Sequence, residues 1–210
     1  MNIKRIDTYQ DKRFSQKALN QHGCFLVDDM PYEVVIISDT EAVIHGREPS
    51  VYADLIDEFR FYTSHITMFY DESHCIIKEF SQKQLLTIKL EQIQPSQFYV
   101  DENKIAAISS FIRRPEDIII QVLPHRDRYI SLDGHTRLYY AVMQGWESVR
   151  AVTEVSDEWV YRFVEEARKR NIHTPMDLIP VTHDEYTVKW NRFCDDFFAE
   201  AEENTKPADF

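Results

Sequence analysis

The stretch from Tyr129 to Ala141, YISLDGHTRLYYA, changes its character at its centre. Its first four residues favour a β-strand, and Asp133-Gly134 is a turn signal. The residues from Leu138 onward favour a helix, and Gly145 is well placed to end it. The order of these signals predicts a strand that turns directly into a helix.

The start of such a helix is a potential anion site. Its first backbone N–H groups lack partners within the helix, and the helix dipole favours negative charge there. Two interpretations fit the polar residues of the turn. In one, Asp133 caps the helix and Arg137 forms a structural ion pair. In the other, the turn holds phosphate, with bidentate contacts from Arg137 and a hydroxyl from Thr136.

Composition limits the partners that the protein can have. The 210 residues suffice for one domain or two small ones with a real hydrophobic core. Lysine and arginine total 24 against 36 acidic residues, so the net charge of −12 disfavours binding to nucleic acid. The region around the turn is close to neutral and rich in arginine, which fits a small phosphorylated ligand better.

Other signals of location and chemistry are absent from the sequence. The three cysteines are far apart and predict neither a disulfide framework nor a zinc site. The N-terminus is charged where a signal peptide needs an apolar run, and no run approaches membrane-spanning length. We therefore expect a cytoplasmic protein without a membrane partner.

The first part of the chain is predicted to be rich in β-structure. Three short runs, 24–27, 32–37 and 41–45, favour an antiparallel meander. A helix is expected over 51–62, followed by a hairpin over 66–80. Residues 1–22 are polar and say little, apart from a short amphipathic pattern around residues 14–19. We expect residues 1–84 to form a small β-rich α+β unit of unknown role.

The middle of the chain alternates strands and helices. Strands are expected at 86–90, 118–122 and 150–153, with a break at Pro95 and a helix that begins near Asp101. The β-branched run at 118–122 is typical of a strand covered on both faces. Residues 85–155 should form one core, and residues 156–205 a helical segment packed on it. The whole chain is predicted to be an α+β protein with a mixed sheet.

Residues 90–96, the helix and strand that follow, and residues 132–146 together resemble the ParB/sulfiredoxin-like superfamily. The resemblance covers about residues 85–155. In that superfamily a Gly-x-x-Arg turn binds nucleotide phosphates, in ParB proteins that use CTP, in ATP-using sulfiredoxin and in free serine kinases, whose turn is similar to Asp-Gly-His-x-Arg here. The resemblance implies that phosphates of ATP or another nucleotide are held by Gly134, His135, Thr136 and Arg137.

Three departures narrow what the resemblance implies. His135 stands where sulfiredoxin has its catalytic cysteine, so the sulfur-repair reaction lacks its nucleophile. The ParB form has a run of arginines after the glycine, whereas this turn has only Arg137. Free serine kinases place a glutamate as general base where Gln97 stands here, and the nearest carboxylates are Asp101 and Glu102.

Several residues keep two possible roles. Asp133 could coordinate a Mg²⁺ that bridges phosphates, or act on the acceptor. His135 could be a general acid or base, or a ring packed over the turn. Arg113 and Arg114 could clamp the ligand, or stabilise a helix C-terminus.

The sequence therefore predicts a nucleotide-binding protein that transfers a phosphoryl group to a small, amino-acid-like molecule. Catalysis would come mainly from positioning and charge neutralisation, with Asp133 and His135 as the candidate catalytic residues. Two alternatives stay open. One is a non-catalytic regulator that responds to nucleotide, and the other is a ParB-like nucleic-acid-binding protein or nuclease.

Overall fold

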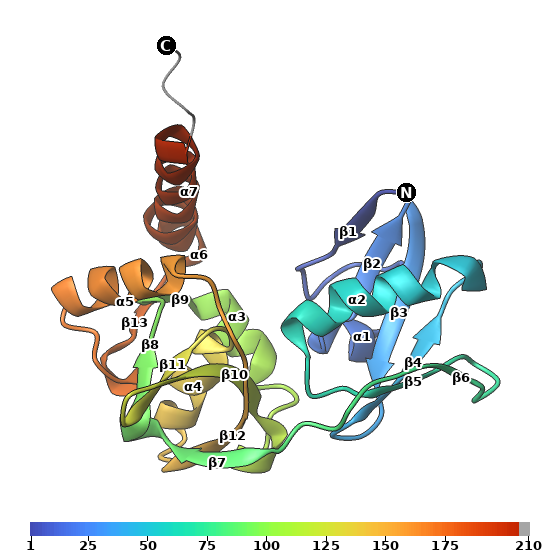
Figure 1. The fold of residues 1–210 in the computed structure, drawn as a ribbon, viewed down its shortest axis with the longest axis horizontal. Helices are drawn as coiled ribbons and strands as arrows, with labels where there is room; N and C mark the ends of the chain where they lie inside the picture. The colour runs from blue at the N-terminus through green and yellow to red at the C-terminus, as the bar shows by residue number, and fades with distance from the viewer. Residues whose placement is uncertain (206–210) are drawn as a thin grey trace.

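The computed structural model describes residues 1–205 (Figure 1). A six-stranded sheet is built entirely from the first 79 residues, in the order β1-β2-β3-β4-β5-β6. Neighbouring strands are antiparallel except β4 and β5, which pair in parallel across the helix α2. The elements of this N-terminal unit are β1 (Ile3–Arg5), α1 (Gln16–Asn20), β2 (Cys24–Val27), β3 (Met30–Ile36), β4 (Glu41–His45), α2 (Tyr52–Tyr62), β5 (Met68–Tyr70) and β6 (Ile76–Glu79).

The core of the N-terminal unit lies between α2 and the sheet. Phe59 on α2 meets Phe25 of β2 and Phe69 of β5 edge to face, each at 6.3 Å between ring centroids. All three rings are fully buried, and such aromatic contacts add to the free energy of apolar burial. The helix expected at 51–62 and the meander before it are both confirmed.

A five-stranded mixed sheet follows, in the order β7-β12-β10-β11-β8. Its central strand β10 is buried over residues 119–122, as its β-branched run predicted. The strands and helices of this second unit are β7 (Leu86–Lys89), β8 (Ile93–Pro95), β9 (Tyr99–Asp101), α3 (Glu102–Ile108), β10 (Ile119–His125), β11 (Arg128–Ser131), α4 (His135–Met143) and β12 (Ser148–Thr153). The prediction of an α+β fold is confirmed.

Two local expectations need correction. Residues 93–95 were expected to break a strand but form β8, which pairs in parallel with β11. Strand β8 lies at the edge of its sheet, where the missing N–H of Pro95 interrupts no central ladder. In residues 1–22, α1 overlaps the amphipathic pattern at 14–19, but β1 has no counterpart in the expectations; Leu19 of α1 is buried in a cluster with Cys24 of β2 and Val35 of β3.

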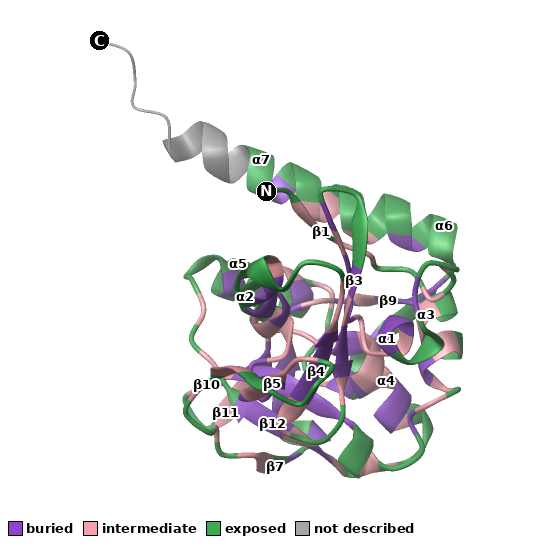
Figure 2. Ribbon diagram, turned by 90° about the vertical axis from the view of Figure 1, so that its right-hand side faces the viewer, coloured by how far each residue is buried: buried purple, intermediate pink, exposed green. Residues whose placement is uncertain are grey.

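The C-terminal segment combines helices with one more strand. Strand β13 (Ile179–Val181) pairs in parallel with β9, and Phe163 of α5 (Trp159–Lys169) packs on Phe193 and Phe197 of α7 (Arg192–Thr205). Between β13 and α7 lie α6 (His183–Tyr186) and a π-helical turn (Thr187–Asn191). Helix α7 projects away from both sheets, and most of its described surface is exposed (Figures 1 and 2). Within residues 1–205 no helix is long and apolar enough to cross a membrane.

The two units contact each other through polar groups on several elements. Arg150 of β12 forms an ion pair with Asp39, which follows β3. Lys83 and Glu154 form a second pair between the linker and the end of β12. The Gln121 amide donates to the carbonyl of Phe61 at 3.2 Å. These contacts hold the N-terminal unit beside the second sheet.

Candidate functional site

The predicted strand–turn–helix is present between β11 and α4. Gly134 is the N-cap residue of α4 and has φ +81°, in the left-handed region that favours glycine. No side chain of the described chain caps this helix end. The first backbone N–H groups of α4 therefore remain available to an anion.

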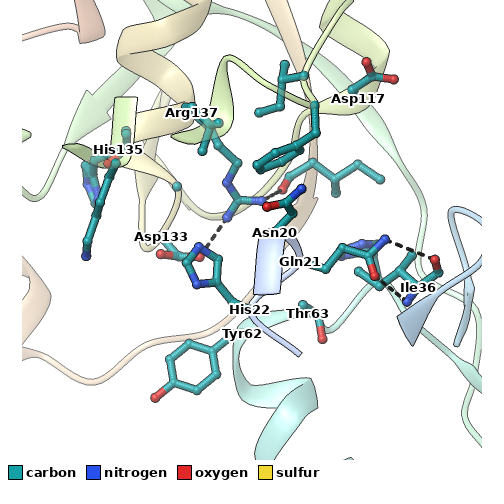
Figure 3. Close-up of a pocket in the computed structure, with 18 of the residues that line it drawn as sticks. Asn20, Gln21, His22, Ile36, Tyr62, Thr63, Asp117, Asp133, His135 and Arg137 are labelled. Carbon is teal, nitrogen blue, oxygen red and sulfur yellow. Dashed lines mark hydrogen bonds and ion pairs between the residues drawn. The ribbon is translucent and has the colours of Figure 1, made fainter. Parts of the chain in front are cut away.

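Arg137 lies in the first turn of α4, and its guanidinium lies next to Gly134. One terminal nitrogen donates to the Ile119 carbonyl at 2.7 Å, and the other donates to Asp133 Oδ2 at 2.9 Å (Figure 3). A guanidinium has five N–H donors, and these two contacts leave three of them. Arg137 can therefore bind an anion without giving up the ion pair that orients it.

Asp133 holds a half-exposed carboxylate at the mouth of the turn. Partial burial opposes its ionisation, but the charge of Arg137 and the Gly134 amide outweigh this effect and lower the pKa of Asp133. The group is therefore a carboxylate at neutral pH. Asp133 does not cap the helix with its side chain, because Gly134 occupies the N-cap position.

His135 is buried behind the turn and lies apart from the ion pair in Figure 3. Its Nε2 lies 3.0 Å from Ser131 Oγ and 3.3 Å from Ser96 Oγ, and it accepts a hydrogen bond from the backbone N–H of Gln97 at 3.3 Å. Burial lowers the pKa of His135 to about 4, so the ring is neutral. These contacts favour the packed-ring role of His135 over proton transfer to a ligand.

Of the other residues expected at the site, two line the cleft and one lies at the C-terminal end of α3. Thr136 is half-buried and lines the cleft, as does Arg114. Arg113 instead donates to the carbonyls of Ser109 and Ser110, at 3.0 and 2.6 Å, and so closes the end of its own helix. Of the two arginines considered as a clamp, the structure brings only Arg114 to the cleft.

Near β9, structural contacts occupy both the Gln97 side chain and the Asp101 carboxylate. The side-chain amide of Gln97 donates to the carbonyl of Tyr99 and, at 3.2 Å, to the Tyr186 hydroxyl. Asp101 is buried, caps α3 by accepting from the Asn103 amide, and lies 2.7 Å from His183 Nδ1. Glu102 is exposed on the first turn of α3.

The turn opens into a cleft of about 990 Å³ between the two units. Both units supply its walls, which the sequence did not indicate. The cleft contains cationic side chains from distant parts of the chain, and four of them, Arg5, Arg114, Arg137 and Arg150, form ion pairs with carboxylates of the cleft. Its cations are Arg5, Lys17, Lys104, Arg114, Arg137 and Arg150, and its carboxylates are Asp7, Asp39, Glu116, Asp117 and Asp133.

The N-terminal unit brings Tyr9 and His22 to the turn. The Tyr9 hydroxyl lies 3.0 Å from His22 Nε2. The charges of Asp133 and Arg137 contribute to the pKa of both side chains, so both lie near this ion pair. His22 lies beside this ion pair in Figure 3. Neither residue belongs to a local motif, so only the fold could reveal their position.

Metal-ligating side chains do not gather in the described residues: no group of three or more His, Cys, Asp or Glu is arranged to hold a metal ion. A Mg²⁺ at this turn would need oxygens from a phosphate ligand in addition to Asp133, which is a coordination that Mg²⁺ commonly adopts.

The protein has an α+β fold, and its turn between β11 and α4 lines a cleft to which both sheet units contribute. No family model matches the chain, and no curated protein matches it in sequence. Among solved structures it is similar to protein Atu1540 from Agrobacterium tumefaciens, with 16% identity and a TM-score of 0.34. That alignment covers 48% of this chain and 64% of the other, so the chain spans less than two thirds of that protein. A likeness of this size carries no argument about function.

Proposed function

We propose that the protein binds a nucleoside di- or triphosphate, with its phosphates at residues 134–137. The observation that carries this proposal is the left-handed Gly134 at an uncapped helix start, with Arg137 folded over it. Backbone N–H groups, the helix dipole and the remaining guanidinium donors all favour a multiply charged anion at one point.

The cleft supports a ligand larger than a phosphate. Its volume of about 990 Å³ is at the upper end of the range of about 300–1,000 Å³ typical of small-molecule sites. A nucleotide and a small acceptor would both fit in a space of this size. Lys104 supplies further positive charge on the wall that the second unit forms, and the guanidinium groups of Arg114 and Arg150 lie on the same wall in ion pairs with Asp117 and Asp39.

We further propose that the reaction is phosphoryl transfer to a small molecule held against the N-terminal unit. Arg137 and the helix N-terminus would neutralise charge on the transferred group. Asp133 is the ionised carboxylate nearest the turn, so it would accept the proton of an acceptor hydroxyl or help to hold Mg²⁺. Bound Mg²⁺ would supply further charge neutralisation on the phosphates.

Calorimetry with ATP, ADP and CTP tests the binding site. We expect Arg137→Ala to abolish measurable binding and Arg137→Lys to weaken it, because lysine keeps the charge but not the fork of donors. Arg47→Ala is the matched control, since Arg47 is exposed and lies outside the cleft. Unchanged affinity in a folded Arg137→Ala variant contradicts the assignment.

Turnover separates phosphoryl transfer from nucleotide-dependent regulation. Incubation of the protein with ATP and a panel of amino acids and sugars should yield a phosphorylated acceptor and ADP. Binding without turnover across the panel favours the regulator. The net charge of −12 disfavours the nucleic-acid alternative, which salt-sensitive retention of DNA would support.

A further inference from the structure

The pair formed by Tyr9 and His22 faces the phosphate-type turn from the opposite unit. His22 follows α1 and adopts φ +54°, a left-handed conformation that costs free energy for a residue with a Cβ. This backbone conformation places the ring beside Asp133 and Arg137 (Figure 3). The left-handed residue ends α1, where the Gly23 backbone N–H donates to the Ala18 carbonyl at 2.9 Å and the His22 backbone N–H donates to the Leu19 carbonyl at 3.1 Å.

The two nitrogens of His22 differ in their surroundings. Nε2 is held by the Tyr9 hydroxyl at 3.0 Å. Nδ1 is buried and has no hydrogen-bond partner within residues 1–205, since the nearest carboxylate oxygen, Asp7 Oδ1, is 3.7 Å away. Asp7 itself accepts from Arg5 at 2.8 Å. A buried polar atom without a partner is costly, and a ligand would remove that cost.

We propose that His22 is a ligand-binding residue, whose Nδ1–H donates to a phosphate oxygen of the nucleotide held at residues 134–137. The N-terminal unit thereby completes the site. This inference rests on the proposed nucleotide binding and assigns a role to a residue outside the resembling region.

The protonation states of the pair agree with this role. Burial raises the pKa of Tyr9 to about 12, so its hydroxyl retains its proton. Burial lowers the pKa of His22 to about 4, so the ring carries a single N–H. If the Tyr9 hydroxyl donates to Nε2, that N–H is on Nδ1, the ring nitrogen that has no hydrogen-bond partner within residues 1–205. The opposite tautomer would present a lone pair to an anion, so a bound phosphate selects the first arrangement.

The positive φ of His22 limits the substitutions that can replace it without added backbone strain. His22→Gly relieves the left-handed conformation and removes the ring. His22→Asn keeps an N–H near the position of Nδ1, and asparagine tolerates positive φ. His74→Gly is the matched control, because His74 has φ +58° but is exposed on the β5–β6 hairpin, outside the cleft.

Calorimetric titration of ATP with Mg²⁺ into the four full-length proteins is the experiment. We expect the Kd to rise about tenfold or more in His22→Gly, as for loss of a hydrogen bond to a charged group. His22→Asn should bind more tightly than His22→Gly, and His74→Gly should match the wild type. In ¹⁵N-histidine NMR spectra, ATP should protect the Nδ1 proton of His22 from exchange with water.

The possible failures are distinguishable. If wild-type protein binds ATP, Arg137→Ala abolishes binding, and folded His22→Gly binds within twofold of wild type, the role of His22 is wrong and the proposed function stands. If wild-type protein does not bind ATP, ADP or CTP, the proposed function fails and the inference fails with it.

Discussion

Gly134 lies so close to Ile120 of the central strand that a Cβ on the glycine would be 2.5 Å from Ile120 Cγ2. The same Cβ would be 3.2 Å from two nitrogens of the Arg137 guanidinium. The glycine is therefore required for three reasons at once: the left-handed turn, the packing of α4 on the sheet, and the placement of the arginine.

Gly134→Ala should destabilise the protein strongly. The left-handed conformation costs an alanine about 1–2 kcal/mol, and overpacking against Ile120 costs about 1–3 kcal/mol more. Gly145→Ala is the control, because Gly145 has φ +69° but no atom within 4 Å of an added Cβ. Urea unfolding should show a loss of only about 1–2 kcal/mol for Gly145→Ala. Equal losses in both variants would contradict the close contact with Ile120.

Stability should fall as the pH is lowered from 7 towards 4. Burial lowers the pKa of His22, His65 and His135 to about 4 each, against about 6.5 in an unfolded chain. Between these values the unfolded chain binds more protons than the folded protein, so the free energy of unfolding rises with pH. The histidine contribution is fully present above pH 6.5 and is lost by about pH 4.

The measurement is urea unfolding at pH 7 and pH 5. His135→Gln removes one titrating group from the buried set, so its free energy of unfolding should change less between the two pH values. His45→Gln is the control, since the half-exposed ring of His45 lies outside the cleft, with its Nδ1 3.3 Å from Glu72 Oε1. A pH dependence that is the same for wild type and His135→Gln would refute the buried neutral state.

Gln94→Leu should cost about 1–3 kcal/mol of stability, because it leaves buried polar groups without partners. The buried Gln94 amide donates to the carbonyl of Ile172 at 2.9 Å and accepts from Arg168 Nε at 3.1 Å. Gln92→Leu, at an exposed position of the same segment, should be close to neutral. Similar unfolding midpoints for the two variants would show that this network is dispensable.

The ion pair between Asp39 and Arg150 should make a small, salt-dependent contribution. Both side chains are partly exposed, so a double-mutant cycle of Asp39→Asn and Arg150→Gln should give a coupling of about 0.2–1 kcal/mol. In 1 M salt the coupling should diminish, because screening shortens the range of the attraction. A coupling that is absent at low salt argues against this contact between the units.

Local signals explain what could be predicted from the sequence. The strand–turn–helix around Gly134 depends on β-propensity, a glycine and a helical pattern, all within a few residues. The capping box that starts α6 is another local feature, since the side chains of Thr182 and Glu185 make both of its contacts within four residues. The β-branched run at 118–122 is a local signal as well, because such a run is typical of a strand covered on both faces.

Tertiary context explains what could not be predicted. Pro95 was taken as a break, because the sequence does not say that its strand lies at a sheet edge. Helix α1 has only five residues and is stabilised by the burial of Ala18 and Leu19 in a cluster with residues from two strands. Tyr9 and His22 reach the turn through the packing of the two units, which no local pattern encodes.

All strands of the first sheet lie within residues 3–79, whereas the turn at 133–137 comes much later in the chain. During synthesis from the N-terminus, this sheet can therefore be complete before the ribosome has made Gly134 and Arg137. The half of the cleft that the N-terminal unit supplies can thus be synthesised as a whole before the half that carries Gly134 and Arg137.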